Sequence, residues 1–135
     1  MIKDAEPNIL SADGPLRQTL GLIGDLWSPQ VIYLLSFGTK RYNEFQKKIP
    51  GISNKTLTQT LRSLELHGLV HRKVYAVVPP KVEYSLSNLG KKFVAPIKIL
   101  VAWSETHSQE LAEAAKQYQE RSELKNLSLE EKSKK

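Results

Sequence analysis

Residues 52–70 read ISNKTLTQTLRSLELHGLV and combine a stripe of leucines with side chains that can pair with nucleic acid. Leu57, Leu61 and Leu64 recur at helical spacing, which predicts the buried face of a helix. The other faces carry hydroxyl, amide and cationic groups: Lys55, Thr56, Thr58, Gln59, Arg62 and Ser63. Gln suits adenine, Arg suits guanine, and hydroxyl groups suit bases or phosphate. The pattern predicts a helix that reads DNA bases, with a merely polar, solvated helix as the alternative.

Cations before, within and after this helix predict contacts with DNA phosphates. Ser53 is expected to cap the helix, and the positive N-terminus at residues 53–55 is expected to be a phosphate site. Lys40 and Arg41 come just before the preceding helix. Lys73 and Lys81 fall on or beside a hairpin that follows. The predicted DNA-binding residues are Lys40, Arg41, Ser53, Asn54, Lys55, Thr56, Thr58, Gln59, Arg62, Ser63, Lys73 and Lys81.

The distribution of charge agrees with a partner that is a polyanion. The chain carries a net charge of +6 with an isoelectric point near 9.5. Residues 39–81 hold nine Lys and Arg against two Glu, a net charge of +7, which leaves −1 for the rest of the chain. A basic middle between near-neutral ends favours a surface that faces nucleic acid. For Lys47 and Lys48, phosphate contact and simple solvation both stay open.

The elements that must position these residues follow from periodicity and from helix and turn signals. The predicted helices span residues 15–24, 28–38, 42–49 and 53–67, with caps expected at Ser28 and Ser53. Residues 70–76 and 82–86 alternate between apolar and polar, which predicts two antiparallel strands. The loop between them contains Pro79 and Pro80, which cannot donate to a strand ladder. A last helical region begins after a cap at Ser87 and is bent or restarted at Pro96.

Two short helices joined by a Pro-Gly turn and followed by a hairpin predict a winged helix-turn-helix. The fold class is therefore mainly α with a small antiparallel β-hairpin, with added N- and C-terminal helices. The expected organisation is an N-terminal arm over residues 1–14, one winged domain over residues 15–118, and a charged, frayed or disordered tail over residues 119–135.

Other chemistry is disfavoured by the sequence. There is no Cys, which excludes disulfides and thiolate metal sites in these residues. His67 and His71 are four apart, but Gly68 and a helix end separate them, so no metal or other cofactor is expected. No nucleophile–base pattern indicates an enzyme. No leader peptide pattern and no apolar stretch long enough for a membrane is present, so a cytoplasmic protein with no membrane contact is expected.

The chain resembles the HxlR-type winged-helix transcriptional regulators, whose fold is related to that of MarR proteins. The matching segments are LIGDLWSPQVIYLL, RYNEFQKKIPGISNKTLTQTLRSLELHGLV and YAVVPPKVEYSLSNLG, followed by a later Trp. The resemblance implies a homodimer on a two-fold operator in double-stranded DNA, with the first and the C-terminal helices at the dimer interface. By this resemblance the interface residues are Leu16, Leu20, Ile97, Leu100, Val101 and Trp103, for which burial in the chain's own core is the alternative.

One position departs from the family pattern. Many members carry a Cys just before the proline that opens the first helix, and some sense oxidants or electrophiles through it. Gly14 stands at this position here, so a regulator that is not a cysteine-based redox sensor is expected. An unidentified small molecule in the dimer groove is one option for an effector, and no residue pattern identifies it. Two rival functions are a winged helix used for protein–protein contact and an architectural DNA binder without sequence preference.

Overall fold

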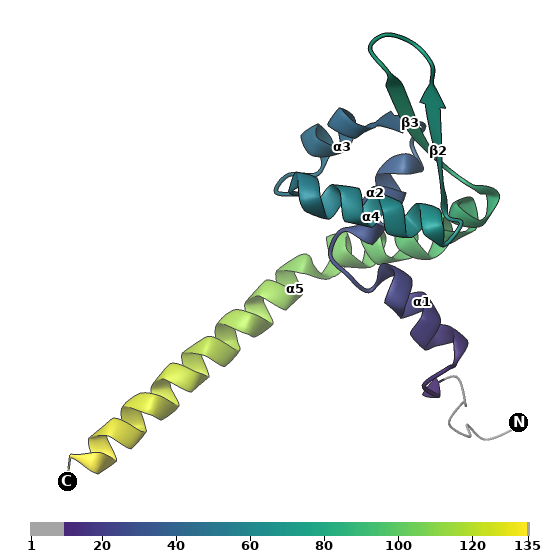
Figure 1. Cartoon of the computed structure of the whole chain (residues 1–135). Coiled ribbons are helices and arrows are strands. Elements are labelled where there is room, and N and C mark those ends of the chain that lie inside the picture. Colours follow the sequence, from purple (N-terminus) through teal and green to yellow (C-terminus); the bar gives the residue numbers. More distant parts are fainter. Residues whose placement is uncertain (1–9, 135) are drawn as a thin grey trace, which may run out of the picture. The chain divides into compact units, whose positions relative to one another are not determined.

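The computed structural model describes residues 10–134, and the chain divides into two compact units, Met1–Ile97 and Lys98–Lys135. The elements are α1 (Pro15–Ile23), α2 (Ser28–Leu35), β1 (Lys40–Arg41), α3 (Tyr42–Lys48), α4 (Asn54–Leu66), β2 (Val70–Tyr75), β3 (Lys81–Leu86) and α5 (Asn88–Ser133). Figure 1 shows this order from purple to yellow. Most of the expected N-terminal arm lies outside the described residues.

Each of the two helices before the helix-turn-helix has a proline in its first turn. Pro15 opens α1, and Gly24 ends it with its N–H bonded to the Leu20 carbonyl. The cap predicted at Ser28 is wrong, because Ser28 is a buried residue of α2 itself. Asp25 does this work instead: its Oδ2 accepts from the N–H groups of Trp27 at 3.1 Å and Ser28 at 3.0 Å. A carboxylate there also suits the positive end of the helix.

The predicted caps and turns around α4 are confirmed. Ser53 Oγ accepts a hydrogen bond from the Thr56 N–H at 3.1 Å. Gly51, in the turn before α4, has a φ of 85°, which favours a residue without Cβ. After α4, Gly68 has a φ of 76°, and His67 Nδ1 lies 2.7 Å from the Ser63 carbonyl. These contacts satisfy backbone groups that the helix ends leave unpaired.

The predicted hairpin is confirmed, and a third strand joins it. β2 and β3 pair antiparallel from Val70↔Leu86 to Tyr75↔Lys81. β1 pairs with the other edge of β3, so the strand order is β1-β3-β2. The sequence analysis missed β1 because a strand of two residues has no measurable alternation.

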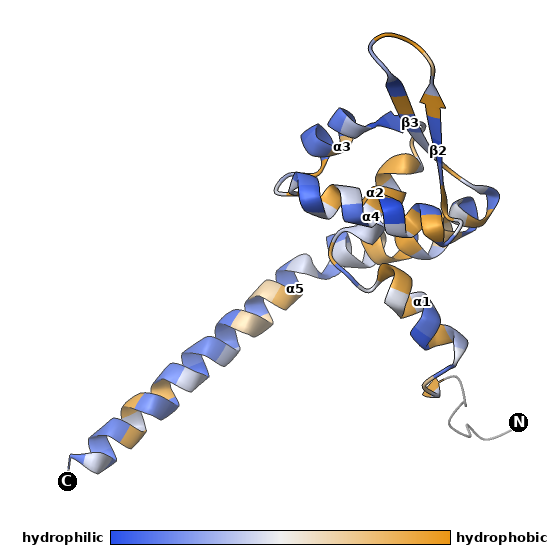
Figure 2. Ribbon diagram, in the orientation of Figure 1, coloured by the Kyte–Doolittle hydropathy of each residue, from blue (hydrophilic) through white to orange (hydrophobic). Residues whose placement is uncertain are grey.

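The core of the first unit forms around α2, which contacts α1, α3, α4 and β3. Figure 2 shows α2 as largely hydrophobic at the centre of this unit. The core side chains include Val31, Ile32, Phe45, Leu57, Leu61, Leu64, Leu69 and Ile97, all at most 3% exposed. The edge of the Phe45 ring meets the Tyr84 ring at a centroid distance of 5.9 Å, which joins α3 to the sheet.

Hydrogen bonds at Ser87 tie the start of α5 to the end of α4. The Ser87 hydroxyl donates to the Gly68 carbonyl at 2.6 Å and accepts from the Gly90 N–H at 3.0 Å, so the cap predicted at Ser87 is confirmed. A Cβ at Gly90 would lie 2.1 Å from the Leu69 carbonyl oxygen, so the close approach of α5 requires glycine there. The junction therefore fixes the hairpin relative to α4.

The second unit consists of α5 beyond Ile97. Residues 119–133 are helical, whereas the sequence analysis expected a frayed or disordered tail. No Gly or Pro follows Pro96, and Glu, Leu and Lys make up nine of residues 119–133, so helix propensity favours a helix there even without a packed face. α5 also runs through Pro96 without a break and passes residue 118, so the domain boundary placed there stays a prediction.

Candidate nucleic-acid interface

The outward face of α4 is defined by the burial of its residues. Leu57, Leu61 and Leu64 are at most 3% exposed and face the core, as predicted. Lys55, Gln59 and Arg62 are exposed, and Thr56, Thr58 and Ser63 are half-buried along their flanks. The sequence pattern had assigned the same residues to the same sides of the helix. Two exposed cations and an amide on one rigid helix form a surface with several donors and an amide acceptor.

The N-terminus of α4 is tied to α3. Asn54 and Lys55 are exposed there, and Ser53 caps the first turn. The Asn54 side-chain oxygen accepts a hydrogen bond from the Gln46 amide of α3. Two of the predicted phosphate contacts, Ser53 and Asn54, therefore also make hydrogen bonds within the protein. Nothing in the sequence pattern had indicated Gln46.

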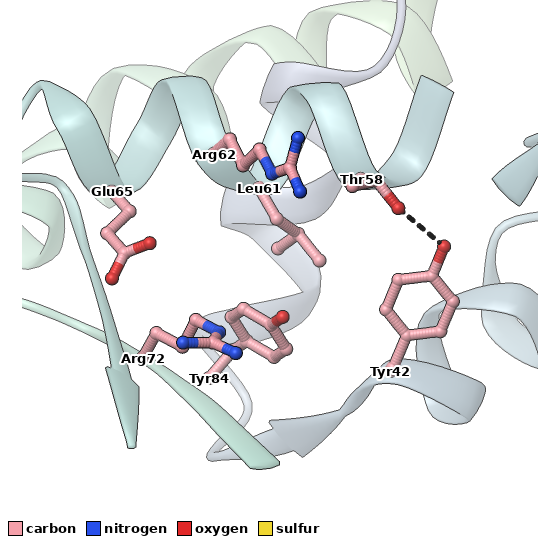
Figure 3. A pocket seen from close by; sticks show the side chains of 7 residues that line it. All are labelled: Tyr42, Thr58, Leu61, Arg62, Glu65, Arg72 and Tyr84. Carbon is pink, nitrogen blue, oxygen red and sulfur yellow. Dashed lines mark hydrogen bonds between the residues drawn. The ribbon is translucent and has the colours of Figure 1, made fainter. Parts of the chain in front are cut away.

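Tyr42 is a residue that the sequence analysis missed as part of the site. Its hydroxyl donates to the Asn54 carbonyl at 2.9 Å and lies 2.9 Å from Thr58 Oγ1 (Figure 3). The phenol thus joins the first residue of α3 to two turns of α4. The Thr58 hydroxyl, predicted as a DNA contact, points toward this internal partner. A tyrosine at a helical position expected to be apolar is a signal in the sequence that its hydroxyl needs a partner. Which residues it bonds depends on the angle between α3 and α4, which the sequence pattern does not give.

A cavity of about 340 Å³ lies between α4 and the sheet. Figure 3 shows side chains from both elements around it, with the guanidinium groups of two arginines and one carboxylate. The lining residues are Tyr42, Thr58, Leu61, Arg62, Glu65, Arg72 and Tyr84. Arg72 of β2 and Arg62 of α4 both line this cavity. Two guanidinium groups against one carboxylate give the lining of the cavity a net positive charge.

Sheet register separates two cations that were expected to act together. Lys40 lies opposite Tyr84, and Arg41 lies opposite Glu83. Neighbouring residues of a strand point to opposite faces of the sheet. Lys40 is therefore on the face of the buried Tyr84, and its ammonium donates to the Gly38 carbonyl at 3.2 Å. Arg41 is exposed on the other face.

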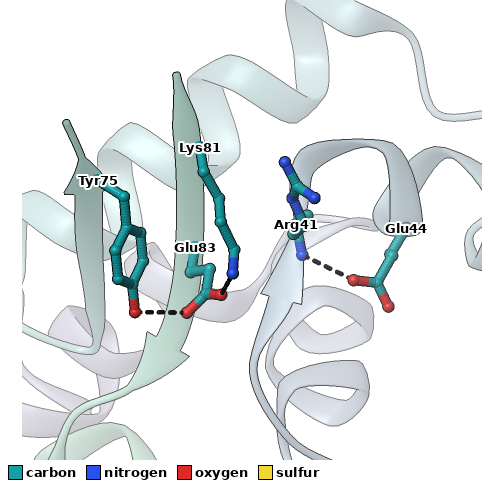
Figure 4. A network of polar contacts seen from close by, with 5 residues as sticks. All are labelled: Arg41, Glu44, Tyr75, Lys81 and Glu83. Carbon is teal, nitrogen blue, oxygen red and sulfur yellow. Dashed lines mark hydrogen bonds and ion pairs between the residues drawn. The ribbon is translucent and has the colours of Figure 1, made fainter. Parts of the chain in front are cut away.

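The wing carries a polar cluster centred on Glu83 (Figure 4). The Lys81 ammonium lies 2.9 Å from Glu83 Oε1, and the Tyr75 hydroxyl donates to Oε2 at 3.0 Å. Lys73 Nζ lies 4.8 Å from the centroid of the Tyr75 ring. The hydrogen bonds from Lys81 and Tyr75, with the charges of Lys81 and Lys73, hold the pKa of Glu83 below its usual range. The residues of the loop at the wing tip, residues 76–80, are all exposed.

The predicted interface residues differ in burial. In the first unit, Leu16 and Leu20 of α1 are 37% and 52% exposed. Ile97 is 2% exposed, so the core alternative holds for this residue. In the second unit, Leu100 and Trp103 are about half-exposed and Val101 is half-buried.

Within residues 10–134, none of the helices has the length and apolar character needed to cross a membrane. Among the same residues, His, Asp and Glu side chains do not gather in threes as a metal site requires.

Comparison with known proteins places this geometry in a family. The sequence model of the HxlR-like helix-turn-helix family matches residues 22–112 of this chain. The HTH-type transcriptional regulator YdeP of Bacillus subtilis (strain 168) is 42% identical over 97 residues, which cover 72% of this chain and 76% of the relative.

Solved structures of regulators share the fold. The reduced form of the redox regulator HypR aligns with a TM-score of 0.70 at 41% identity over 73% of this chain and 97% of that one. A transcriptional regulator ytfH from Salmonella typhimurium also aligns with a TM-score of 0.70, at 34% identity over 78% of this chain and 95% of that one. The fold is that of the winged-helix, MarR-like regulators. This chain therefore belongs to the HxlR-like helix-turn-helix family and is a transcriptional regulator with a helix-turn-helix domain.

Proposed function

We propose that this regulator binds double-stranded DNA sequence-specifically, as a homodimer on a two-fold operator. In the proposal α4 enters the major groove and the β2–β3 hairpin lies beside the minor groove. The observation that carries it is the exposed face of α4, where Lys55, Gln59 and Arg62 stand opposite the buried leucines. A helix of this kind fits a groove about 12 Å wide.

Base reading is assigned to Gln59 and Arg62. Both side chains are exposed, and they lie three residues apart on one face of α4. Gln can pair with adenine through two hydrogen bonds, and Arg can do so with guanine. Because Ser53 caps α4 and Tyr42 ties it to α3, the helix that presents these groups is rigid.

Phosphate contact is assigned to cations around α4: Lys40, Arg41, Lys55, Lys73 and Lys81. The basic excess of residues 39–81 supports this part of the proposal. Each phosphate that such a cation neutralises releases counterions, so binding should weaken linearly with salt on logarithmic axes. Ser53, Asn54, Thr56, Thr58 and Ser63 complete the proposed DNA-facing set.

Dimerisation is proposed through apolar side chains that the two units leave exposed. Leu16 and Leu20 belong to α1, and Leu100 and Trp103 belong to the second unit. Two recognition helices are needed to read paired half-sites about one helical turn apart. Light scattering at micromolar concentration tests this directly, and a strict monomer would contradict the two-fold operator.

The regulatory input is proposed to be independent of cysteine. HypR is described as a redox regulator, whereas the 135 residues of this chain contain no Cys. An unidentified small molecule is proposed as the effector. Treatment with a thiol-specific oxidant should leave DNA affinity unchanged, and a reversible loss of binding would contradict this point. A regulator of chromosomal genes would act in the cytoplasm, and this location belongs to the proposal.

The test of the function is to sequence genomic DNA recovered with the protein and then titrate it with the recovered site. A palindromic site that is bound far more tightly than a scrambled duplex is the expected result. Equal binding of both duplexes would favour an architectural DNA binder. Absence of salt-dependent binding to any duplex would favour a protein–protein interaction module.

A further inference from the structure

The outer face of the sheet holds one carboxylate among cations. Arg41 on β1 and Lys73 on β2 both lie directly opposite Glu83 on β3. Directly opposed residues share a face, and residues two apart on one strand share it too. Lys81 therefore lies on the same face as Glu83, next to Tyr75 on β2. The core-facing residues of β3, Tyr84 and Leu86, point the other way, so this cluster faces outward.

Both oxygens of the Glu83 carboxylate are occupied. Oε1 is 2.9 Å from the Lys81 ammonium, and Oε2 accepts from the Tyr75 hydroxyl at 3.0 Å (Figure 4). The same Tyr75 ring carries the Lys73 ammonium at 4.8 Å and the Lys81 ammonium at 5.0 Å from its centroid. The Lys81 and Glu83 side chains are only 39% and 23% exposed. The wing cations are thus held against a carboxylate and a ring rather than extended into solvent.

These donors are the ones that a phosphate would use. A carboxylate accepts from an ammonium and a phenol in the same way as a phosphate oxygen does. A phosphate can contact the Lys81 ammonium in two ways. Either the ammonium leaves the Glu83 carboxylate, or the negatively charged phosphate comes close to that carboxylate. Either event weakens binding, and neither depends on the base sequence.

We propose that Glu83 is an intramolecular competitor for DNA phosphate, which occupies Lys81 and Tyr75 in the free protein and lowers affinity for duplexes of every sequence. This inference rests on the proposed DNA-binding function. The carboxylate limits the time that the protein spends on non-specific DNA, while the bases read by α4 set the preference among sequences.

The two acids of residues 39–81, Glu44 and Glu65, have surroundings that differ from those of Glu83. Glu44 Oε1 accepts from the Arg41 N–H at 3.1 Å, which caps α3, so its loss would damage the fold. Glu65 is exposed beside the cavity on α4, and no hydrogen bond or ion pair of its carboxylate occurs among residues 10–134. Glu65→Gln therefore removes the same charge as Glu83→Gln without releasing a lysine, which makes it the matched control.

The test is a fluorescence titration of labelled random-sequence duplex DNA over a series of salt concentrations. Glu83→Gln should bind about two- to tenfold more tightly at low salt, as expected for release of an exposed ion pair and loss of one negative charge. The plot of log affinity against log salt should steepen by about 0.9, one further phosphate contact. Glu65→Gln should leave this slope unchanged. Glu83→Thr, which suits a strand, repeats the measurement if the amide disturbs the hairpin.

A double-mutant cycle assigns the effect to Lys81. In a Lys81→Met background, Glu83→Gln should no longer change the salt slope, because the lysine that pairs with the Glu83 carboxylate is already gone. An effect of Glu83→Gln that Glu65→Gln matches, or that persists without Lys81, overturns the inference. So does an unchanged or weakened affinity of a folded Glu83 variant, because the ion pair would then prepare Lys81 for DNA. If the wild-type protein binds no duplex at low salt, the proposed function itself fails.

Discussion

The outward face of α4 and the outer face of the β2–β3 hairpin are both basic, but their cations are held differently. On α4, Lys55 and Arg62 extend from a helix that is fixed by contacts on its other sides. On the hairpin, Lys81 is bound to Glu83 and packed on Tyr75. The comparison suggests a division of work in which α4 selects sequence and the hairpin adjusts affinity. Three substitutions test this division, from the largest expected effect to the smallest, and a fourth tests the scaffold that supports both regions.

Arg62→Ala should cost about 1–3 kcal/mol of binding free energy at the recovered operator and should relax the preference at one base position. The reason is the loss of two hydrogen bonds from the guanidinium group to a guanine. Titration with the operator and with single-base variants measures both effects. Arg62→Lys is the control, since it keeps the charge but loses the planar fork. Unchanged selectivity in Arg62→Ala would remove the base-reading role from α4.

Tyr42→Phe should lower the free energy of unfolding by about 0.5–1.5 kcal/mol, because its hydroxyl bonds both the Asn54 carbonyl and Thr58. Operator selectivity should fall with it, since α4 is less firmly held on α3. Chemical denaturation and the operator titration are the two measurements. Tyr118→Phe, on an exposed tyrosine of the second unit, serves as the control. If stability falls but selectivity does not, the phenol is structural only.

Lys81→Ala should weaken binding to all sequences alike and reduce the salt slope by less than one phosphate contact. The effect is small because Glu83 already occupies this lysine in the free protein. In the Glu83→Gln background the same substitution should reduce the slope by about 0.9. Salt titrations measure this difference when Lys81→Ala is compared with the wild-type protein and the double variant is compared with Glu83→Gln. A sequence-dependent loss would place base reading on the hairpin and break the comparison.

Asp25→Ala tests the scaffold on which both regions rest. Partial burial raises the pKa of Asp25, but hydrogen bonds from Ser28 and Trp27 outweigh it, so the pKa is lower than its usual 3.8. A lowered pKa in the folded state stabilises the protein above pH 3.8, and this contribution is lost as the pH falls through the lowered value.

The substitution should cost about 1 kcal/mol near neutral pH, as for other lost helix caps. The difference in melting temperature from the wild-type protein should shrink at pH values below 3.8. Circular dichroism melts between neutral and acidic pH measure it. Asp25→Asn, which keeps an acceptor without the charge, should lose less. A difference that stays constant with pH would mean that the carboxylate charge has no part in the cap.

Much of the fold could be predicted because its signals are local. Ser53 precedes a leucine stripe and caps α4, and Gly68 follows the stripe and ends the helix. The exposed positions on α4 follow directly from the same period. A charged, Ser-rich composition predicted a frayed or disordered tail over residues 119–135, whereas residues 119–133 are helical and contain no helix breaker.

The parts that could not be predicted depend on which strands and helices meet. β1 is a strand only because Lys40 and Arg41 pair with the edge of β3 that β2 leaves free. In the sequence, Glu83 is an ordinary polar residue of an alternating strand. Only the register of the sheet shows that cations lie opposite it on both neighbouring strands. Tyr42 likewise acquires its role from the angle between α3 and α4. Pairing across the sheet and between helices is therefore the information that local patterns lack.

The central claim is that the exposed face of α4 reads sequence. Its most direct test is a competition titration in which the wild-type protein chooses between the recovered operator and a scrambled duplex of equal length at physiological salt. The account predicts a preference of about a thousandfold or more for the operator, the range of specific DNA-binding proteins. Equal affinity for the two duplexes would contradict it.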